Sequence, residues 1–126
     1  MGNRAAILFF DDRIVSPTIY LHWHGTRLPE WIERLRLRMQ GRFGDASYAA
    51  ARFVGLCHEQ IDGPLSLGIL SNQLTPGLLR GRSLLESLSP GNAGLVVVDT
   101  RDFTWTAYAG ELAVYHHNSS TPRRPS

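Results

Sequence analysis

The sequence contains one cysteine, no lysine and no long apolar run. With a single thiol, Cys57, no intramolecular disulfide can form, which excludes the small secreted folds that depend on disulfides. The apolar run at residues 5–10 is too short for the core of a secretion signal, and no run approaches the roughly 18 residues of a membrane-spanning helix. We therefore expect a cytoplasmic protein that is not associated with a membrane.

Catalytic and cofactor-binding signatures are also missing. The sequence has no P-loop, no Rossmann glycine fingerprint, no Gly-x-Ser-x-Gly motif, no His-Glu-x-x-His motif and no Cys-x-x-Cys pair. We therefore expect no cofactor, and the sequence favours a binding protein over an enzyme.

Basic and acidic side chains balance over most of the chain. Of the 13 basic residues, all arginine, Arg123 and Arg124 lie after residue 120, which leaves 11 arginines against 11 carboxylates before it. A neutral body lacks the basic surface that binds a phosphate backbone, so direct nucleic-acid binding is not expected. Residues 1–115 have enough apolar side chains for a single domain, and residues 116–126 have the composition of a flexible polar tail.

Five short segments have the pattern of β-strands, because they are apolar or alternating and end at turn residues. They cover residues 4–10, 18–24, 65–70, 94–98 and 103–109. In the second segment the side chains of Ile19, Leu21 and Trp23 share one face, and we expect this face to pack on the core.

Two segments have the spacing of amphipathic helices. Residues 28–39 place five apolar side chains on one face: Leu28, Trp31, Ile32, Leu35 and Met39. A second helix is expected over residues 46–59, with Asp45 as its N-cap and Cys57 in the core. The order β-β-α-α-β-β-β predicts an α+β fold, an antiparallel sheet of about five strands with two amphipathic helices on one face. Between residues 71 and 91, a short helix and a loop with one helical turn fit equally well.

His22 and His24 are two residues apart on a predicted strand. Both side chains would point to one face about 7 Å apart, a spacing that a metal ion can bridge. The candidates for a third ligand are His58, Glu59, Asp99 and the tail histidines His116 and His117. Because nothing in the sequence selects one of them, we expect two histidines hydrogen-bonded on a polar sheet face and no bound metal.

Arginines gather in and after the first predicted helix. They alternate with Glu30, Glu33 and Asp45, so a solvated helix face is one interpretation and a surface for an acidic partner is the other. In the second interpretation, exposed aromatic side chains would join the arginines. The candidate partner surface consists of Trp31, Arg34, Arg38, Arg42 and Phe43.

The segment Tyr20-Leu21-His22-Trp23-His24-Gly25 resembles the strand end aromatic-x-His-Trp-x-Gly of a family of small uncharacterised proteins from phages and mobile elements. Further short motifs match in order between residues 5 and 108. They are Asp45, Tyr48 and Arg52 in the second helix, Leu65, Gly68 and Ile69 in a strand, and Val97 and Asp99 in a hairpin. The resemblance implies that His22, Trp23 and Gly25 are a shared element. Members of this family often carry Gly or Asn at the position of His24, so a His-x-His metal site is not implied.

The missing catalytic motifs and this resemblance together suggest two functions. The first is a non-enzymatic interaction protein of phage or mobile-element origin that binds a host or defence-system protein in the bacterial cytoplasm, for example to inhibit a CRISPR complex. The alternative is a ligand- or nucleotide-binding protein, or a metal-dependent enzyme, whose polar pocket contains His22, His24, Tyr48 and Arg52. An exposed sheet edge would also support a homodimer, although no residue specifies one.

Overall fold

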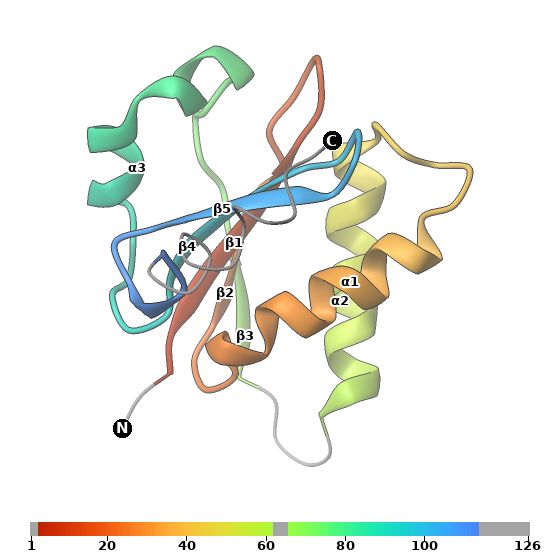
Figure 1. The fold of residues 1–126 in the computed structure, drawn as a ribbon, viewed down its shortest axis with the longest axis horizontal. Helices are drawn as coiled ribbons and strands as arrows, with labels where there is room; N and C mark the ends of the chain where they lie inside the picture. The colour runs from red at the N-terminus through yellow and green to blue at the C-terminus, as the bar shows by residue number, and fades with distance from the viewer. Residues whose placement is uncertain (1–2, 62–65, 114–126) are drawn as a thin grey trace, which may run out of the picture.

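A computed structural model describes residues 3–61 and 66–113, which form a five-stranded sheet with helices against both of its faces (Figure 1). The strands are β1 (Ala5–Phe10), β2 (Thr18–Leu21), β3 (Leu67–Leu70), β4 (Gly94–Asp99) and β5 (Thr104–Tyr108). The helices are α1 (Leu28–Arg38), α2 (Ala46–Gln60) and α3 (Arg82–Ser87), with 3-10 helices η1 (Gly25–Arg27) and η2 (Pro76–Arg80). The α+β class is confirmed. The predicted tail, residues 116–126, lies outside the described residues.

The strand order is β3-β2-β1-β4-β5, with β1 at the centre. Three of the four neighbouring pairs are antiparallel, but β1 and β4 run parallel, from Ala5 opposite Gly94 to Phe10 opposite Asp99. The prediction of a wholly antiparallel sheet is therefore wrong for this pair. The reason is the connection over residues 71–93, which leaves β3 at one edge and crosses the sheet to the far side of β1. A crossover of this length is what parallel pairing requires.

This crossover contains residues 71–91, for which the sequence was equally compatible with a short helix and with a loop. It forms both η2 and α3, and it covers the face of the sheet that α1 and α2 leave open (Figure 1). The sheet therefore has two cores. Ile7 and Phe9 of β1 pack in the core with α1 and α2, whereas Ala6 and Leu8 pack with Leu85 of α3. Burial on both faces explains why β1 is apolar at every position.

The second strand ends at Leu21, three residues earlier than expected. The chain turns because Gly25 donates its N–H to the Asn3 carbonyl at 2.8 Å, in a place without room for a side chain. A Cβ atom at Gly25 would lie 2.6 Å from that same carbonyl oxygen and 2.7 Å from the Cβ of Ala93. Ile19 and Leu21 are buried as predicted, but Trp23 lies beyond the strand and is 53% exposed. Its predicted place on the core face is wrong.

Candidate interaction surfaces

The two histidines after β2 contact different aromatic rings. His22 lies between Tyr20 and Trp23, with ring centroids 6.4 and 4.4 Å away. His24 stacks on Trp31 of α1, with centroids 6.0 Å apart. The Nδ1 atom of His24 is buried and has no hydrogen-bond partner among the described residues, so this nitrogen lacks the predicted bond. Because both residues lie beyond the end of β2, the pairing on one strand face does not form.

Two of the candidate third ligands are paired with arginines. Glu59 pairs with Arg38 at 2.7 Å, and Asp99 pairs with Arg101 at 2.8 Å. His116 and His117 lie outside the described residues. Within residues 3–61 and 66–113, no three His, Cys, Asp or Glu side chains are grouped as ligands for a metal ion.

Tyr48 lies in the first turn of α2 and Arg52 one turn further along, and two arginine side chains lie over the Tyr48 ring. The guanidinium of Arg42 is 3.8 Å from the centroid of the Tyr48 ring, and that of Arg52 is 6.0 Å away. Asp45 caps the helix as predicted, because its side chain accepts the Tyr48 N–H at 3.0 Å. The arrangement stacks one tyrosine under two arginines and orients the first turns of α2.

The structure does not bring Tyr48 and Arg52 together with His22 and His24. The first turn of α2 is attached to the end of β1, where Asp11 accepts the Ala46 N–H at 2.9 Å. The histidines follow Leu21, which pairs with Ala5 at the start of β1. A six-residue strand is about 17 Å long, so the first turn of α2, with Tyr48, lies at the opposite end of β1 from the histidines. The geometry therefore gives no support to a single pocket formed by the four residues.

The arginines of the candidate partner surface are paired with neighbouring carboxylates. Arg34 contacts Glu30 at 3.2 Å, and Arg42 contacts Asp45 at 3.1 Å. Like the Arg38–Glu59 pair, these contacts balance charge locally, which is typical of a solvated helix face. Hydrogen bonds from Arg27 and Arg34 lower the pKa of Glu30.

The two aromatic residues of that surface differ in their positions. Trp31 is fully buried in the core and cannot contact a partner, so its assignment to the surface is wrong. The physical reason is that it lies on the same helical face as Leu28 and Leu35, which packs on the sheet. Phe43 is exposed and packs edge-on against Phe103, with ring centroids 5.1 Å apart.

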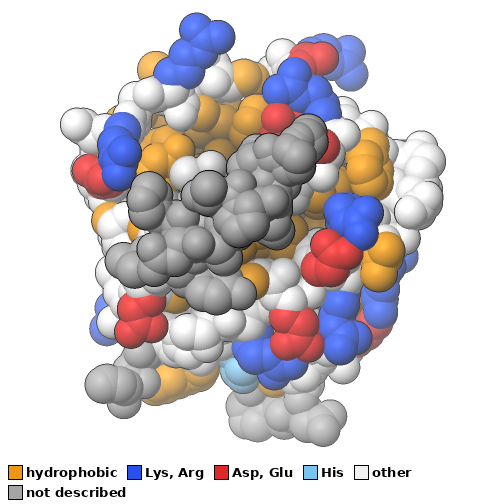
Figure 2. Space-filling view, in the orientation of Figure 1, with side chains coloured by type: hydrophobic (Ala, Val, Ile, Leu, Met, Phe, Trp, Pro, Cys, Tyr) orange, Lys and Arg blue, Asp and Glu red, His pale blue; other side chains and the backbone are white. Residues whose placement is uncertain are grey.

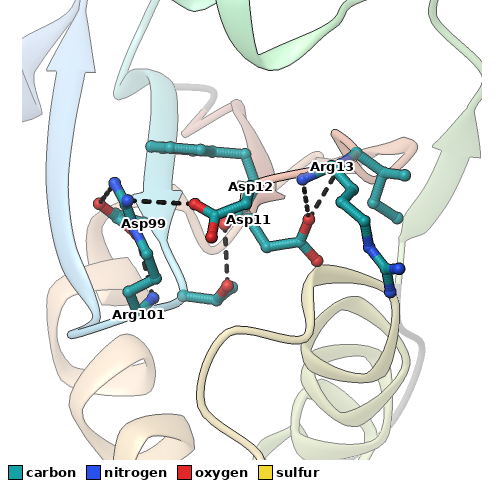
Figure 3. A network of polar contacts seen from close by, with 8 residues as sticks. Asp11, Asp12, Arg13, Asp99 and Arg101 are labelled. Carbon is teal, nitrogen blue, oxygen red and sulfur yellow. Dashed lines mark hydrogen bonds and ion pairs between the residues drawn. The ribbon is translucent and has the colours of Figure 1, made fainter.

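Carboxylates that the sequence analysis did not connect meet beyond the ends of β1 and β4 (Figure 3). Arg101 bridges Asp99 and Asp12, at 2.8 and 3.2 Å. Asp11 accepts the N–H groups of Arg13 and Ile14 on one oxygen and that of Ala46 on the other. Partial burial raises the pKa of Asp11, but these three N–H donors together outweigh burial and hold the pKa below its usual value. The parallel pairing of β1 and β4, which was not predicted, creates this cluster, and its contacts are structural.

The thiol of Cys57 is buried in the core, as predicted. Burial raises its pKa to about 12, so the thiol stays protonated at neutral pH. A protonated thiol is a poor nucleophile, which argues against a catalytic role for Cys57.

A group of exposed leucines on η2 and α3 was not identified from the sequence. Leu78, Leu84 and Leu88, here called the leucine face, are exposed, whereas Leu85 is the only buried residue of α3. A Cβ atom at Gly81 would lie 3.4 Å from the Leu78 carbonyl and 3.7 Å from the Leu84 Cβ, so the two helices adjoin. Figure 2 shows hydrophobic side chains between basic ones on one face of the molecule. The leucine repeat was visible in the sequence, but its outward orientation was not.

Comparisons of the chain with protein-family models, with curated proteins and with solved structures find no match. In the ranges that the structure describes, no helix has both the length and the apolar character needed to cross a membrane.

Proposed function

We propose that the protein acts by binding another protein, and that the leucine face is the contact surface. The observation that carries this proposal is the exposure of Leu78, Leu84 and Leu88 on two adjoining short helices. Single exposed apolar side chains are common on protein surfaces, but exposed leucines that follow one another closely, as Leu84 and Leu88 do one helical turn apart, favour a protein-binding site.

The chemistry of the surface indicates the kind of partner. Burying a leucine that is already half covered contributes about 1 kcal/mol, so the three together would contribute on the order of 3 kcal/mol. Arg80 and Arg82 lie beside the leucines, and the Arg82 side chain, although paired with Glu86, is 80% exposed. A partner with an apolar cleft and carboxylates at its rim would complement this surface.

The proposal is tested by affinity capture of the tagged protein from a bacterial lysate, with the bound proteins identified by mass spectrometry. The binding-surface variant is Leu84→Asp combined with Leu88→Asp. Leu37→Asp is the control, because Leu37 is an exposed leucine on α1, 55% exposed against 37% for Leu84 and 46% for Leu88. We expect the double variant to lose a stoichiometric partner that Leu37→Asp retains.

A second variant tests the arginine surface expected from the sequence. Reversing the charge of Arg34, Arg38 and Arg42 should leave partner capture unchanged, because these side chains are balanced by carboxylates. Loss of the partner in this variant, with retention in the leucine double variant, would contradict the proposal and place the contact on α1 and α2.

We propose a component of a bacterial defence system, such as a CRISPR complex, as the partner. Support for this choice comes from the resemblance of residues 20–25 to phage and mobile-element proteins. In cells with an active CRISPR system, expression of the protein should restore plating of a targeted phage, and the Leu84→Asp, Leu88→Asp variant should not. Unchanged plating with the wild-type protein across several defence systems would contradict this choice of partner.

A further inference from the structure

The edge strand β3 is short, with four residues, but it lacks charged side chains and proline, two of the features that prevent strands from associating. In the described part of the chain, β3 pairs with β2 alone and lies at the end of the strand order. Edge strands are commonly protected by charged side chains or proline. The strand Leu67–Leu70 has neither, and residues 66–79 contain no charged residue.

The backbone of β3 presents a defined set of hydrogen-bonding groups to the outside. His22 donates its N–H to the Ser66 carbonyl at 3.3 Å, one step beyond the Leu21–Leu67 pair of the β2–β3 register. Hydrogen-bonded pairs alternate along an antiparallel ladder. Residue 68 therefore bonds to β2 as residue 66 does, and the N–H and C=O groups of Leu67 and Ile69 point to the free edge.

The side chains at this edge are apolar on both faces of the sheet. Ile69 is 59% exposed and lies opposite Ile19, which faces the core under α1 and α2. Leu70 is also 59% exposed and lies on the other face, the same face as Gly68. An added strand would cover apolar surface on either face.

We propose that two copies of the chain associate through β3, in antiparallel orientation about a two-fold axis normal to the sheet. With the axis at Gly68, Leu67 of each copy meets Ile69 of the other. These are the residues whose backbone groups point outward, so both pairs form the hydrogen bonds of an antiparallel ladder. Their four side chains cluster on the face of α1 and α2. The two five-stranded sheets then join into one.

A second copy of the chain fits this edge because the edge is uncharged. In a dimer with a two-fold axis, each side chain near the axis lies close to the same side chain of the other copy. A charged edge would then set like charges opposite each other, which is unfavourable. Residues 66–79 have no charge to oppose. Because β3 has only four residues, we expect the interface to be smaller than the roughly 800 Å² per partner of a standard complex and the dimer to be weak, with a dissociation constant on the order of tens of micromolar.

Sedimentation velocity over a wide range of protein concentration tests the association. We expect a monomer–dimer equilibrium for the wild-type protein. The Ile69→Lys variant should be a monomer at every concentration, because it places a charge where Ile69 of one copy meets Leu67 of the other. Thr106→Lys is the matched control, because Thr106 is exposed on β5 at the opposite edge. This control should dimerise like the wild type.

A cysteine at the axis tests the register directly. A Cβ atom at Gly68 meets nothing within 4 Å, so Gly68→Cys is accommodated. At a non-hydrogen-bonded antiparallel pair the two Cα atoms are about 4.5 Å apart, which a disulfide can span. We expect mild oxidation to link Gly68→Cys into a covalent dimer and to leave Thr106→Cys unlinked. The native Cys57 is buried and adds little background.

Three results would overturn this proposal: a monomer at all concentrations, a dimer that survives Ile69→Lys, or equal crosslinking at positions 68 and 106. Capture of an extended segment of another protein by β3, with no self-association, would also overturn it. The proposal is independent of the leucine face, because Leu84→Asp with Leu88→Asp should leave the dimer intact.

Discussion

The two helical layers of this protein differ in how much of their apolar surface they bury, although α1 also has one exposed leucine, Leu37. In α1 the apolar side chains Leu28, Trp31, Ile32 and Leu35 are buried against the sheet, and the outer side carries arginine–carboxylate pairs. In α3, which lies on the other side of the sheet (Figure 1), only Leu85 is buried, whereas Leu84 and the C-cap residue Leu88 are exposed. The first layer has the pattern of a helix that stabilises the fold. The second covers the sheet with one side chain of α3 and leaves apolar surface open for contact.

The largest effect is expected in the first layer. Trp31→Ala should lower the free energy of unfolding by about 4 kcal/mol, because it leaves a large cavity under α1. Urea unfolding followed by circular dichroism measures this loss. A loss below about 1 kcal/mol would show that α1 contributes little to the core.

A matched pair of fully buried leucines compares the layers directly. Leu35→Ala should cost about 3 kcal/mol and Leu85→Ala about 2 kcal/mol. The difference is expected because α3, with six residues, can move into the space left by Leu85 more easily than the longer α1. The same urea titrations measure both values, and a larger loss for Leu85→Ala would reverse the comparison.

The attachment of α2 to β1 through Asp11 should make stability depend on pH. The pKa of Asp11 is lower in the folded protein than in the unfolded chain, so its contribution is present above about pH 4 and is lost as the pH falls through the folded-state pKa. Asp11→Asn should cost about 1 kcal/mol at pH 7 and less at pH 3. Urea titrations at both pH values test this expectation. A cost that is the same at both would show that the charge of Asp11 is not involved.

The smallest effect is expected on the leucine face. Leu84→Asp should change the free energy of unfolding by less than about 0.5 kcal/mol, because the side chain is exposed. Leu85→Asp is the contrasting variant, since it places a charge in the second core and should be strongly destabilising. Equal losses for the two variants would mean that both leucines contribute to packing.

Local sequence patterns correctly predicted the features that depend only on residues close together in the chain. The spacing of Leu28, Trp31 and Leu35 indicated α1, and Asp45 indicated the start of α2. The position of Cys57 on the apolar face indicated its burial. Each of these inferences depends on helix geometry or on a cap, which act over one or two turns.

Contacts between distant segments were the source of the errors. Trp23 continued the alternation of β2, but the close packing of Gly25 against Asn3 and Ala93 turns the chain before it. Trp31 was predicted both on the apolar face of α1 and on a partner surface, which are incompatible positions. In the structure it is buried in the core. The predicted pocket combined residues from two short motifs, but the folded chain places the histidines near the start of β1 and the first turn of α2 near its end.

By itself, the sequence determined the apolar strands, the two long helices and the absence of familiar catalytic motifs, because these follow from residue type and local periodicity. Tertiary structure alone decided that β4 runs parallel to β1, that Leu84 and Leu88 are exposed while Leu85 is buried, and that β3 lies at an edge. The physical reason is that a strand or helix with two apolar sides can bury either one. Only the crossover between β3 and β4 selects which sides the folded chain covers and which it leaves exposed.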